Sequence, residues 1–422
     1  MARWLPPTAI NRFRAIYRLL REREAATGEP CLDLSMGNPD RVPPEDLLSL
    51  QSRLARDPAR ALHTYAEDDD IGGFSARMVD LHGRIRSADH PHLAVLPIPG
   101  IKTASALLPL ACGAHLRRSR LRIVIQLPAY DIVGTWGAGY LDAERIHWPL
   151  RPADGMRLHT DHLEAELSRR GLDRADLIVV IRPGNPAPVG ATEAEWLPLI
   201  EHCRARGTRL VNDAAYAGLM PGSHAPLASV AARYPDLEWM ELYSASKSFS
   251  DPGARLGALV GSRDFVSDFE LIKGNADSGP VPYIMAAYAE YLSDEPRARS
   301  GMSDLASLYA ARVESLTAHL RRAGLRQACP TEAGFFTLWQ VPRRVLGVDL
   351  ASHAAREALS LSDAFNRLVA RETGIVGVHF DGAPPGELPQ PLIRYAVCTD
   401  VLSPRAQSRL ERELPRLRPE YE

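Results

Sequence analysis

The 422-residue sequence contains very little lysine: only three lysines stand beside 47 arginines. They are Lys102, Lys247 and Lys273. An enzyme that uses a lysine amine as its nucleophile therefore has three candidates in this chain.

Cysteine is also scarce, and long apolar runs are missing. The five cysteines are dispersed and none forms a CxxC pair, so we expect no disulfide framework and no metal site, which suits a reducing compartment. No stretch approaches about 18 uninterrupted apolar residues, the length that a membrane span needs. The N-terminal residues lack the apolar core of a secretory signal. We therefore expect a cytoplasmic protein with no membrane partner.

The charge is nearly balanced, with 50 basic and 52 acidic residues and a net charge of −2. Proteins that bind nucleic acid usually carry a basic patch or a high isoelectric point, so this balance argues against such a partner. The hydrophobic fraction of 45% is ordinary for a globular protein. At this length, roughly two or three domains are expected.

Short apolar runs alternate with helical segments through the first part of the chain. Strand-like runs occur at 121–128, 176–183, 208–216 and 253–261. Helical segments occur at 9–25, 72–86, 99–116 and 192–206. This alternation predicts an α/β domain with a largely parallel sheet.

The pattern changes near residue 303, where a long amphipathic helix over 303–324 begins. Two strand-like runs follow, at 334–341 and 392–399, around a helical stretch at 351–371. They predict a second, smaller α+β domain, and the Pro/Gly-rich piece 381–391 reads as a loop. We place the domains as follows: the large domain at 60–302 and the small domain at 1–59 and 303–422.

Ligands of open parallel sheets bind beyond the carboxyl ends of the strands. Polar, glycine and aromatic residues follow the predicted strands in this chain: Gly100, Ile101, Lys102, Tyr130, Asn185, Asp213, Tyr216, Ser244, Ser246, Lys247 and Arg255. Each has an ordinary structural explanation when taken alone. Their order and spacing carry the signal.

Two segments have residues suited to carbonyl chemistry. Lys247 lies in SASKSFSDPGARLG, and a lysine amine becomes a nucleophile towards carbonyls when its surroundings lower its pKa. The neighbouring Ser244 and Ser246 are suitable donors to an anion. Asp213 ends an apolar strand, where its carboxylate can bind a protonated pyridine nitrogen and hold the ring as an electron sink. Tyr216 can donate its phenol to a ring hydroxyl.

Other segments have residues suited to a phosphate and a planar ring. The stretch GIKTASALL offers a helix N-terminus with free N–H groups, where Lys102 adds a positive charge. Arg255 can clamp the same phosphate with two hydrogen bonds. Tyr130 can stack on a planar ring.

Together these segments resemble the pyridoxal-phosphate enzymes of fold type I, specifically the class I/II aminotransferase family, from about residue 31 to 400. SASKSFSDPGARLG resembles the family's Ser-x-x-Lys…Arg-x-Gly segment, NDAAYAGL its Asp-x-x-Tyr segment and PGNPAPVG its Asn-Pro-x-x-Gly segment. PGIK resembles the phosphate loop, and LPAY the Pro-x-aromatic segment. The resemblance implies that pyridoxal 5′-phosphate forms a Schiff base, the internal aldimine, with Lys247, and that Arg255 binds its phosphate. It places Asp213 at the pyridine nitrogen, with Tyr216 and Asn185 at the 3′-oxygen.

The same resemblance implies residues for the substrate and for a second subunit. LSMGNPD places Gly37 near the substrate carboxylate, with Asn185 nearby, and LIRYAV gives Arg394 as the main carboxylate anchor. HTYAEDDDIGG provides Tyr65, which would reach the phosphate of the neighbouring subunit in a homodimer with shared active sites. The implied fold has a mostly parallel seven-stranded sheet flanked by helices, with a smaller α+β domain.

Two stretches depart from the family pattern. Ala187, Pro188 and Val189 stand before Gly190, where Thr-Gly is usual, and 277–292 lacks the usual polar, Gln-containing helix start. Both bear on the substrate and on the reaction.

The implied reaction is transamination between an α-amino acid and a 2-oxo acid, in amino-acid metabolism or biosynthesis. The alternative is elimination, replacement, cyclisation or oxidation of an activated amino acid, such as S-adenosylmethionine, through the same quinonoid carbanion. A non-catalytic sensor fused to a DNA-binding domain would need a long N-terminal winged-helix segment, whereas the resemblance begins near residue 31.

Overall fold

The larger of two main sheets has seven strands. The computed structural model describes residues 10–66, 69–116, 119–222, 224–380 and 390–422. The strands lie in the order β2-β8-β7-β6-β5-β3-β4. Their bounds, in that order, are Leu93–Ile98, Gly257–Ser262, Trp239–Ser244, Arg209–Asp213, Leu177–Ile181, Arg122–Leu127 and Glu144–Pro149. Only β8 runs antiparallel to its neighbours, so the prediction of a mostly parallel seven-stranded sheet is confirmed.

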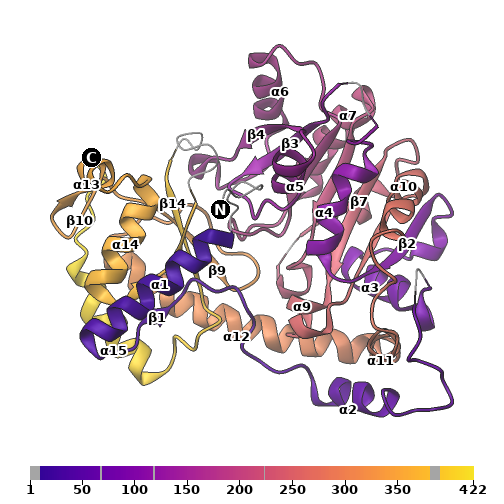
Figure 1. The fold of residues 1–422 in the computed structure, drawn as a ribbon, viewed down its shortest axis with the longest axis horizontal. Helices are drawn as coiled ribbons and strands as arrows, with labels where there is room; N and C mark the ends of the chain where they lie inside the picture. Colours follow the sequence, from indigo (N-terminus) through magenta and orange to yellow (C-terminus); the bar gives the residue numbers. More distant parts are fainter. Residues whose placement is uncertain (1–9, 67–68, 117–118, 223, 381–389) are drawn as a thin grey trace, which may run out of the picture.

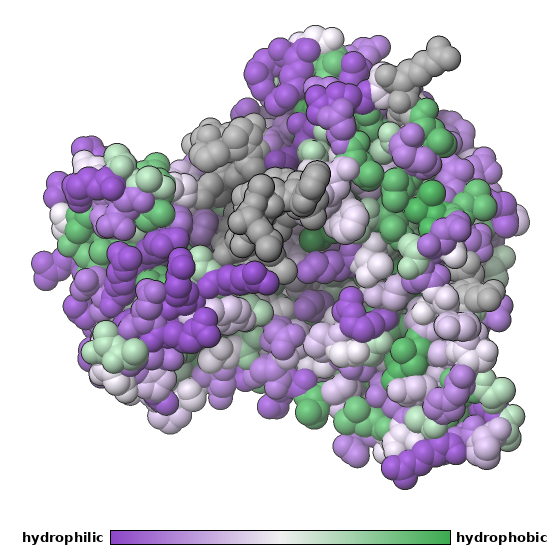
Figure 2. Space-filling model, in the orientation of Figure 1, coloured by the Kyte–Doolittle hydropathy of each residue, from purple (hydrophilic) through white to green (hydrophobic). Residues whose placement is uncertain are grey.

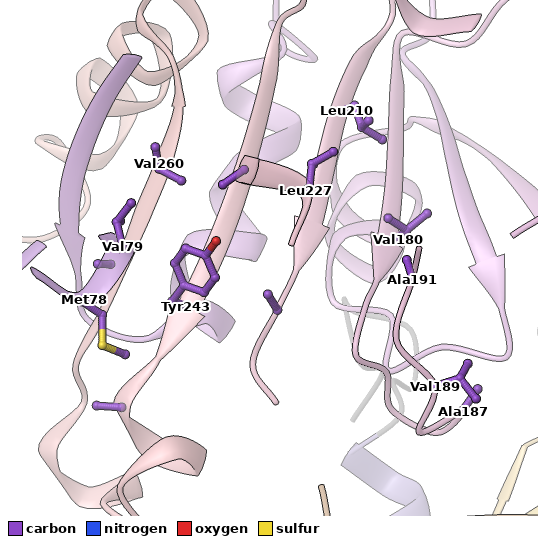
Figure 3. Close-up of a cluster of buried hydrophobic side chains, with 14 of the residues drawn as sticks. Met78, Val79, Val180, Ala187, Val189, Ala191, Leu210, Leu227, Tyr243 and Val260 are labelled. Atoms are coloured by element: carbon purple, nitrogen blue, oxygen red, sulfur yellow. The ribbon is translucent and has the colours of Figure 1, made fainter. Parts of the chain in front are cut away.

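Both faces of this sheet are covered by helices, which is why most of its strand residues are apolar and buried. On one face, Ile123 and Ile125 of β3 pack in a cluster with three helices: α4 (Ile101–Ala111), α5 (Val133–Tyr140) and α10 (Arg263–Lys273). On the other face, Val124 packs with four helices: α3 (Phe74–Gly83), α6 (Thr160–Arg169), α7 (Glu193–Arg206) and α8 (Leu227–Ala231). Figure 3 shows Met78 and Val79 of α3 near Tyr243 and Val260 of the sheet.

Three strands of the large sheet were not anticipated, because each carries a residue that is unusual in a strand. β2 contains Pro97, which is tolerated because β2 is at the edge of the sheet. β7 contains Glu241, which is fully buried. Its carboxylate accepts hydrogen bonds from the amides of Leu227 (3.1 Å) and Ala228 (2.6 Å) and from the Tyr243 phenol (2.7 Å). β4 begins with charged residues and ends in proline.

The smaller part of the molecule has an antiparallel sheet in the order β13-β14-β9, formed by Val378–Phe380, Leu392–Ala396 and Phe336–Gln340. There are also two short strand pairs. β1 (Leu32–Asp33) pairs with β12 (Ile375–Val376), which is distant in sequence, and β10 (Arg344–Val345) forms a hairpin with β11 (Val348–Asp349). In Figure 1 this part lies on the left with α1 (Ile10–Thr27) and α15 (Pro404–Glu413), and α12 (Glu295–Arg322) extends from it towards the larger sheet.

Some predicted bounds differ from the structure. The helical stretch at 351–371 is two helices, α13 (Leu350–Glu357) and α14 (Leu361–Thr373), because Ala358 is left-handed and Ser360 caps α14. α12 begins earlier than expected, at Glu295, where the Asp294 side chain accepts from the Arg297 amide. The predicted loop at 381–391 lies mostly outside the described residues.

The remaining helices are α2 (Glu45–Leu54), α9 (Ala245–Ser248) and α11 (Pro282–Leu292), and α2 packs on α11. The five cysteines, all within the described residues, form no disulfide bond. Among the helices of the described ranges, no candidate for a membrane span was found. The face of the molecule in Figure 2 is largely hydrophilic, with apolar residues scattered over it.

Candidate active site

The structure brings the predicted site residues together around one cavity of about 440 Å³. It lies between the carboxyl end of the large sheet and strand β14 of the smaller one. Its lining includes every predicted site residue except Tyr65: Gly37, Gly100, Ile101, Lys102, Tyr130, Asn185, Asp213, Tyr216, Ser244, Ser246, Lys247, Arg255 and Arg394. Tyr65 is 77% exposed, and its predicted role concerns a neighbouring subunit.

Lys247 lies on the short helix α9, directly after β7. The Ser244 hydroxyl caps this helix by accepting a hydrogen bond from the Ser246 amide, at 3.1 Å. Lys247 Nζ donates to the carbonyl of Gly37 at 2.9 Å. Burial lowers the pKa of Lys247 to about 8, and the charge of Arg394 acts in the same direction. A lysine with a lowered pKa is more often present as the free amine, which is the nucleophilic form.

Asp213 ends strand β6, and Tyr216 lies three residues beyond it. The half-buried Asp213 carboxylate accepts from the Ala215 amide at 3.0 Å, and burial raises the pKa of this carboxyl to about 6. A cationic N–H group beside Asp213 would favour the charged form of this carboxyl and so oppose the effect of burial on its pKa. Tyr216 is buried, with its ring centroid 5.5 Å from that of Phe335 and 5.4 Å from that of Phe336. Burial raises the pKa of Tyr216, so its phenol remains protonated and can donate.

The N-terminus of α4 and Arg255 form a site suited to an anion. Gly100 precedes this 11-residue helix with φ +88°, and a Cβ there would lie 2.8 Å from Arg255 Nη2. Only glycine fits without displacing that guanidinium. The first N–H groups of a helix have no partner within it and favour negative charge. Lys102 Nζ lies 5.9 Å from the Tyr130 ring centroid, so a cation and an aromatic ring adjoin this site.

Arg394 projects from β14 and is 3% exposed. Its Nη1 donates to Asn185 Oδ1 at 2.7 Å, and its Nη2 donates to the Ser35 carbonyl at 2.6 Å. The guanidinium lies over the Phe336 ring, 4.0 Å from the centroid. A guanidinium held in this way is well oriented to bind a carboxylate through paired hydrogen bonds.

Several apolar residues of the same cavity were not anticipated from the sequence, among them Phe13, Met36, Ile132 and Phe336. Phe13 lies on α1, which the sequence predicts as an amphipathic helix, but the pattern does not reveal that this helix reaches the cavity. Met36 precedes Gly37, so its place beside a predicted site residue was the available signal. Lys273 lies elsewhere: it is 1% exposed on its side chain and pairs with Asp277 at 2.9 Å.

Comparisons with known proteins show which family this chain matches. The family described as aminotransferase class I and II matches residues 29–398. Among curated relatives, the LL-diaminopimelate aminotransferase of Syntrophobacter fumaroxidans is 27% identical, covering 84% of this chain and 87% of the relative. The enzyme of that name from Nitratidesulfovibrio vulgaris is 25% identical, covering 75% and 77%.

Solved structures show the same fold at lower identity. Substrate-bound BacF from Bacillus subtilis superposes with a TM-score of 0.76 at 18% identity, covering 99% of this chain and 97% of that one. Aspartate aminotransferase from Thermus thermophilus with maleate gives 0.73 at 17% identity, covering 98% and 96%.

Proposed function

This chain belongs to the class I and II aminotransferase family of pyridoxal-phosphate-dependent enzymes, and we propose that the cavity around Lys247 is its active site. There it transfers an amino group between an α-amino acid and a 2-oxo acid. The observation that carries the proposal is Lys247 itself. Its partly buried amine has a pKa lowered to about 8 and shares a cavity with Asp213 and Arg394.

The side chains and amides of the cavity fit pyridoxal 5′-phosphate. Its phosphate suits the α4 N-terminus, where Gly100 leaves room beside Arg255. Asp213 suits a protonated ring nitrogen, because a cation there offsets the cost of burying its charge. The residues that would hold the group are Gly100, Ile101, Lys102, Tyr130, Asn185, Asp213, Tyr216, Ser244, Ser246, Lys247 and Arg255. When bound, the cofactor supplies a carbonyl carbon that amines attack and a ring that draws electrons from the substrate.

The chain's own residues divide the remaining work. Arg394 binds the α-carboxylate of the amino acid and so fixes the orientation of its Cα. Lys247 Nζ then removes the proton from Cα, since a base with a pKa near the working pH is efficient. The Gly37 carbonyl, 2.9 Å from Nζ, orients this amine when it is not covalently occupied. Tyr216 donates its phenol proton as a hydrogen bond, and Asp213 keeps a positive charge beside it stable.

Elimination, replacement, cyclisation and oxidation are not favoured as alternatives. The curated relatives that cover three quarters or more of this chain are named as aminotransferases, and the family match spans most of its length.

Two substrate classes deserve testing first. The name of the relatives makes LL-diaminopimelate one candidate amino donor. The apolar residues Phe13, Met36 and Ile132 in the cavity lining favour a second candidate, an amino acid with an apolar or aromatic side chain.

A half-reaction tests the function. The enzyme loaded with pyridoxal 5′-phosphate is mixed with LL-diaminopimelate, glutamate, phenylalanine or leucine in the absence of an oxo acid. We expect at least one of them to convert the cofactor to its pyridoxamine form, seen as loss of its visible absorbance, with release of the 2-oxo acid. Elimination products without the pyridoxamine form would contradict transamination.

We also propose a homodimer in which Tyr65 reaches the phosphate of the neighbouring subunit. Its 77% exposure in the single chain leaves its side chain available for that contact. Sedimentation of the enzyme, which measures its oligomeric state, and titration of Tyr65→Phe with the cofactor test this proposal. A fully active monomer would contradict it.

A further inference from the structure

A buried arginine outside the cavity, Arg312 on α12, joins two segments that carry site residues. It is 3% exposed. Its Nη1 lies 2.9 Å from each carboxylate oxygen of Asp40, and 3.2 and 3.4 Å from the carbonyls of Val397 and Cys398. Tyr309, on the same helix, donates its phenol to Asp40 at 3.2 Å. The mechanism above assigns no role to any of these side chains.

Asp40 belongs to a segment, residues 35–41, that crosses the site. The Ser35 carbonyl accepts from Arg394 Nη2 at 2.6 Å, and the Gly37 carbonyl accepts from Lys247 Nζ at 2.9 Å. At its far end, the Arg41 carbonyl accepts from the Ser250 hydroxyl at 2.6 Å. Two carbonyls of this one segment therefore hold Lys247 and Arg394, the two cations that the proposed mechanism uses on the amino acid.

The other side of Arg312 contacts the end of β14. Val397 and Cys398 follow directly after that strand, which ends at Ala396 and carries Arg394. The Arg312 guanidinium thus connects the 35–41 segment to the strand whose arginine this segment orients. Hydrogen bonds between charged groups are stronger than those between neutral groups, so the negative charge of Asp40 contributes directly to this connection.

We propose that the Arg312–Asp40 ion pair is a positioning element of the amino-acid site. It fixes the 35–41 segment against the end of β14, so that the carbonyls of Ser35 and Gly37 hold Arg394 and Lys247 in the arrangement that binds the substrate. This inference rests on the proposed function, because it concerns how that site receives an amino acid. Neither Asp40 nor Arg312 is among the residues that line the cavity.

The test compares Asp40→Asn with Asp46→Asn in the cofactor-loaded enzyme. Asn keeps the shape of the side chain at position 40 and removes its charge. Asp46 is a matched control, because it pairs with Arg297 on the same helix α12, at 3.3 Å, away from the cavity. For Asp40→Asn we expect KM for the amino donor to rise about tenfold, the effect of losing one charged hydrogen bond. Cofactor affinity should stay unchanged, and Asp40→Glu should recover part of the loss.

A second readout needs no turnover. Glutarate and 3-phenylpropionate, two carboxylates without an amine, are titrated into the cofactor-loaded enzyme, and binding is followed through the absorbance of the cofactor. We expect the carboxylate that binds the wild type to bind about tenfold more weakly to Asp40→Asn. Asp46→Asn should match the wild type in both readouts. Unchanged KM and carboxylate binding in Asp40→Asn would overturn the inference. So would a parallel loss of Tm, cofactor affinity and substrate affinity, because that pattern indicates a purely structural ion pair.

The two proposals fail separately. If no amino acid converts the cofactor of the wild-type enzyme, the proposed function fails, and carboxylate binding still decides the role of the ion pair. If the wild type reacts and Asp40→Asn reacts equally well, only the positioning role fails.

Discussion

His82, a buried histidine that contacts the residue following Lys247, should make the stability of the protein fall in mild acid. Its Nδ1 lies 3.0 Å from the Met78 carbonyl, so this nitrogen carries the proton, and Nε2 accepts from the Ser248 hydroxyl at 2.8 Å. Ser248 follows Lys247 directly on α9. Burial lowers the pKa of His82 from 6.5 to about 4, so the folded protein keeps the ring neutral where an unfolded chain would protonate it.

The sign and size of the effect follow from this difference. Between about pH 6.5 and pH 4 the unfolded chain binds more protons at His82 than the folded protein does. The contribution of His82 to the free energy of unfolding is therefore complete above pH 6.5 and is lost as the pH falls towards 4. The whole difference corresponds to about 3 kcal/mol, of which about 2 kcal/mol is lost between pH 7 and pH 4.5.

Urea unfolding followed by circular dichroism at these two pH values measures the effect. His82→Gln keeps an acceptor for Ser248 and removes the titration, so the fall in unfolding free energy should be smaller than in the wild type by about 2 kcal/mol. His90→Gln, a substitution away from Lys247, serves as the control and should leave the fall unchanged. An equal fall in His82→Gln and in the wild type would refute the reasoning.

Three further substitutions probe the cavity itself. In Gly37→Ala the new Cβ would lie 2.5 Å from Phe336 Cζ, so the 35–41 segment must shift. We therefore expect the half-reaction to slow about tenfold. A rate equal to that of the wild type would show that the Phe336 ring moves instead. Asn185→Ala removes the acceptor 2.7 Å from buried Arg394 Nη1, so steady-state kinetics should show a KM for the amino donor raised about tenfold or more. An unaltered KM would count against a role of Asn185 in orienting Arg394. Arg255→Leu should weaken cofactor binding in a fluorescence titration about tenfold or more. The Tm of the cofactor-free protein should stay unchanged, since Arg255 is an exposed residue. Undiminished affinity would remove Arg255 from the phosphate site.

Strands β3 and β5 could be predicted because each contains a run of consecutive apolar, β-branched residues. β7 escaped prediction because Glu241 interrupts its pattern. That carboxylate is stabilised inside the sheet by hydrogen-bond donors that lie mostly on other elements, including the amides of Leu227 and Ala228. Such partners depend on tertiary structure and leave no local signal. The domain division at residues 60 and 302 stays a prediction.

The site could be predicted where a residue lies at or just after the end of a strand in sequence, as Asp213 ends β6 and Lys247 comes soon after β7. The contributions of Phe13 and Arg312 could not, because each depends on how a distant helix packs across the cavity or beside it. A sequence pattern shows which face of a helix is apolar, and the fold decides what that face contacts.

The most direct test of the central claim is to find which lysine holds the cofactor. The enzyme is loaded with pyridoxal 5′-phosphate, reduced with borohydride, digested and mapped by mass spectrometry, with Lys247→Ala as the control. We predict the label on Lys247 and no label in the variant, together with loss of transamination. A label on Lys102 or Lys273 in the wild type, or full activity of Lys247→Ala, would contradict it.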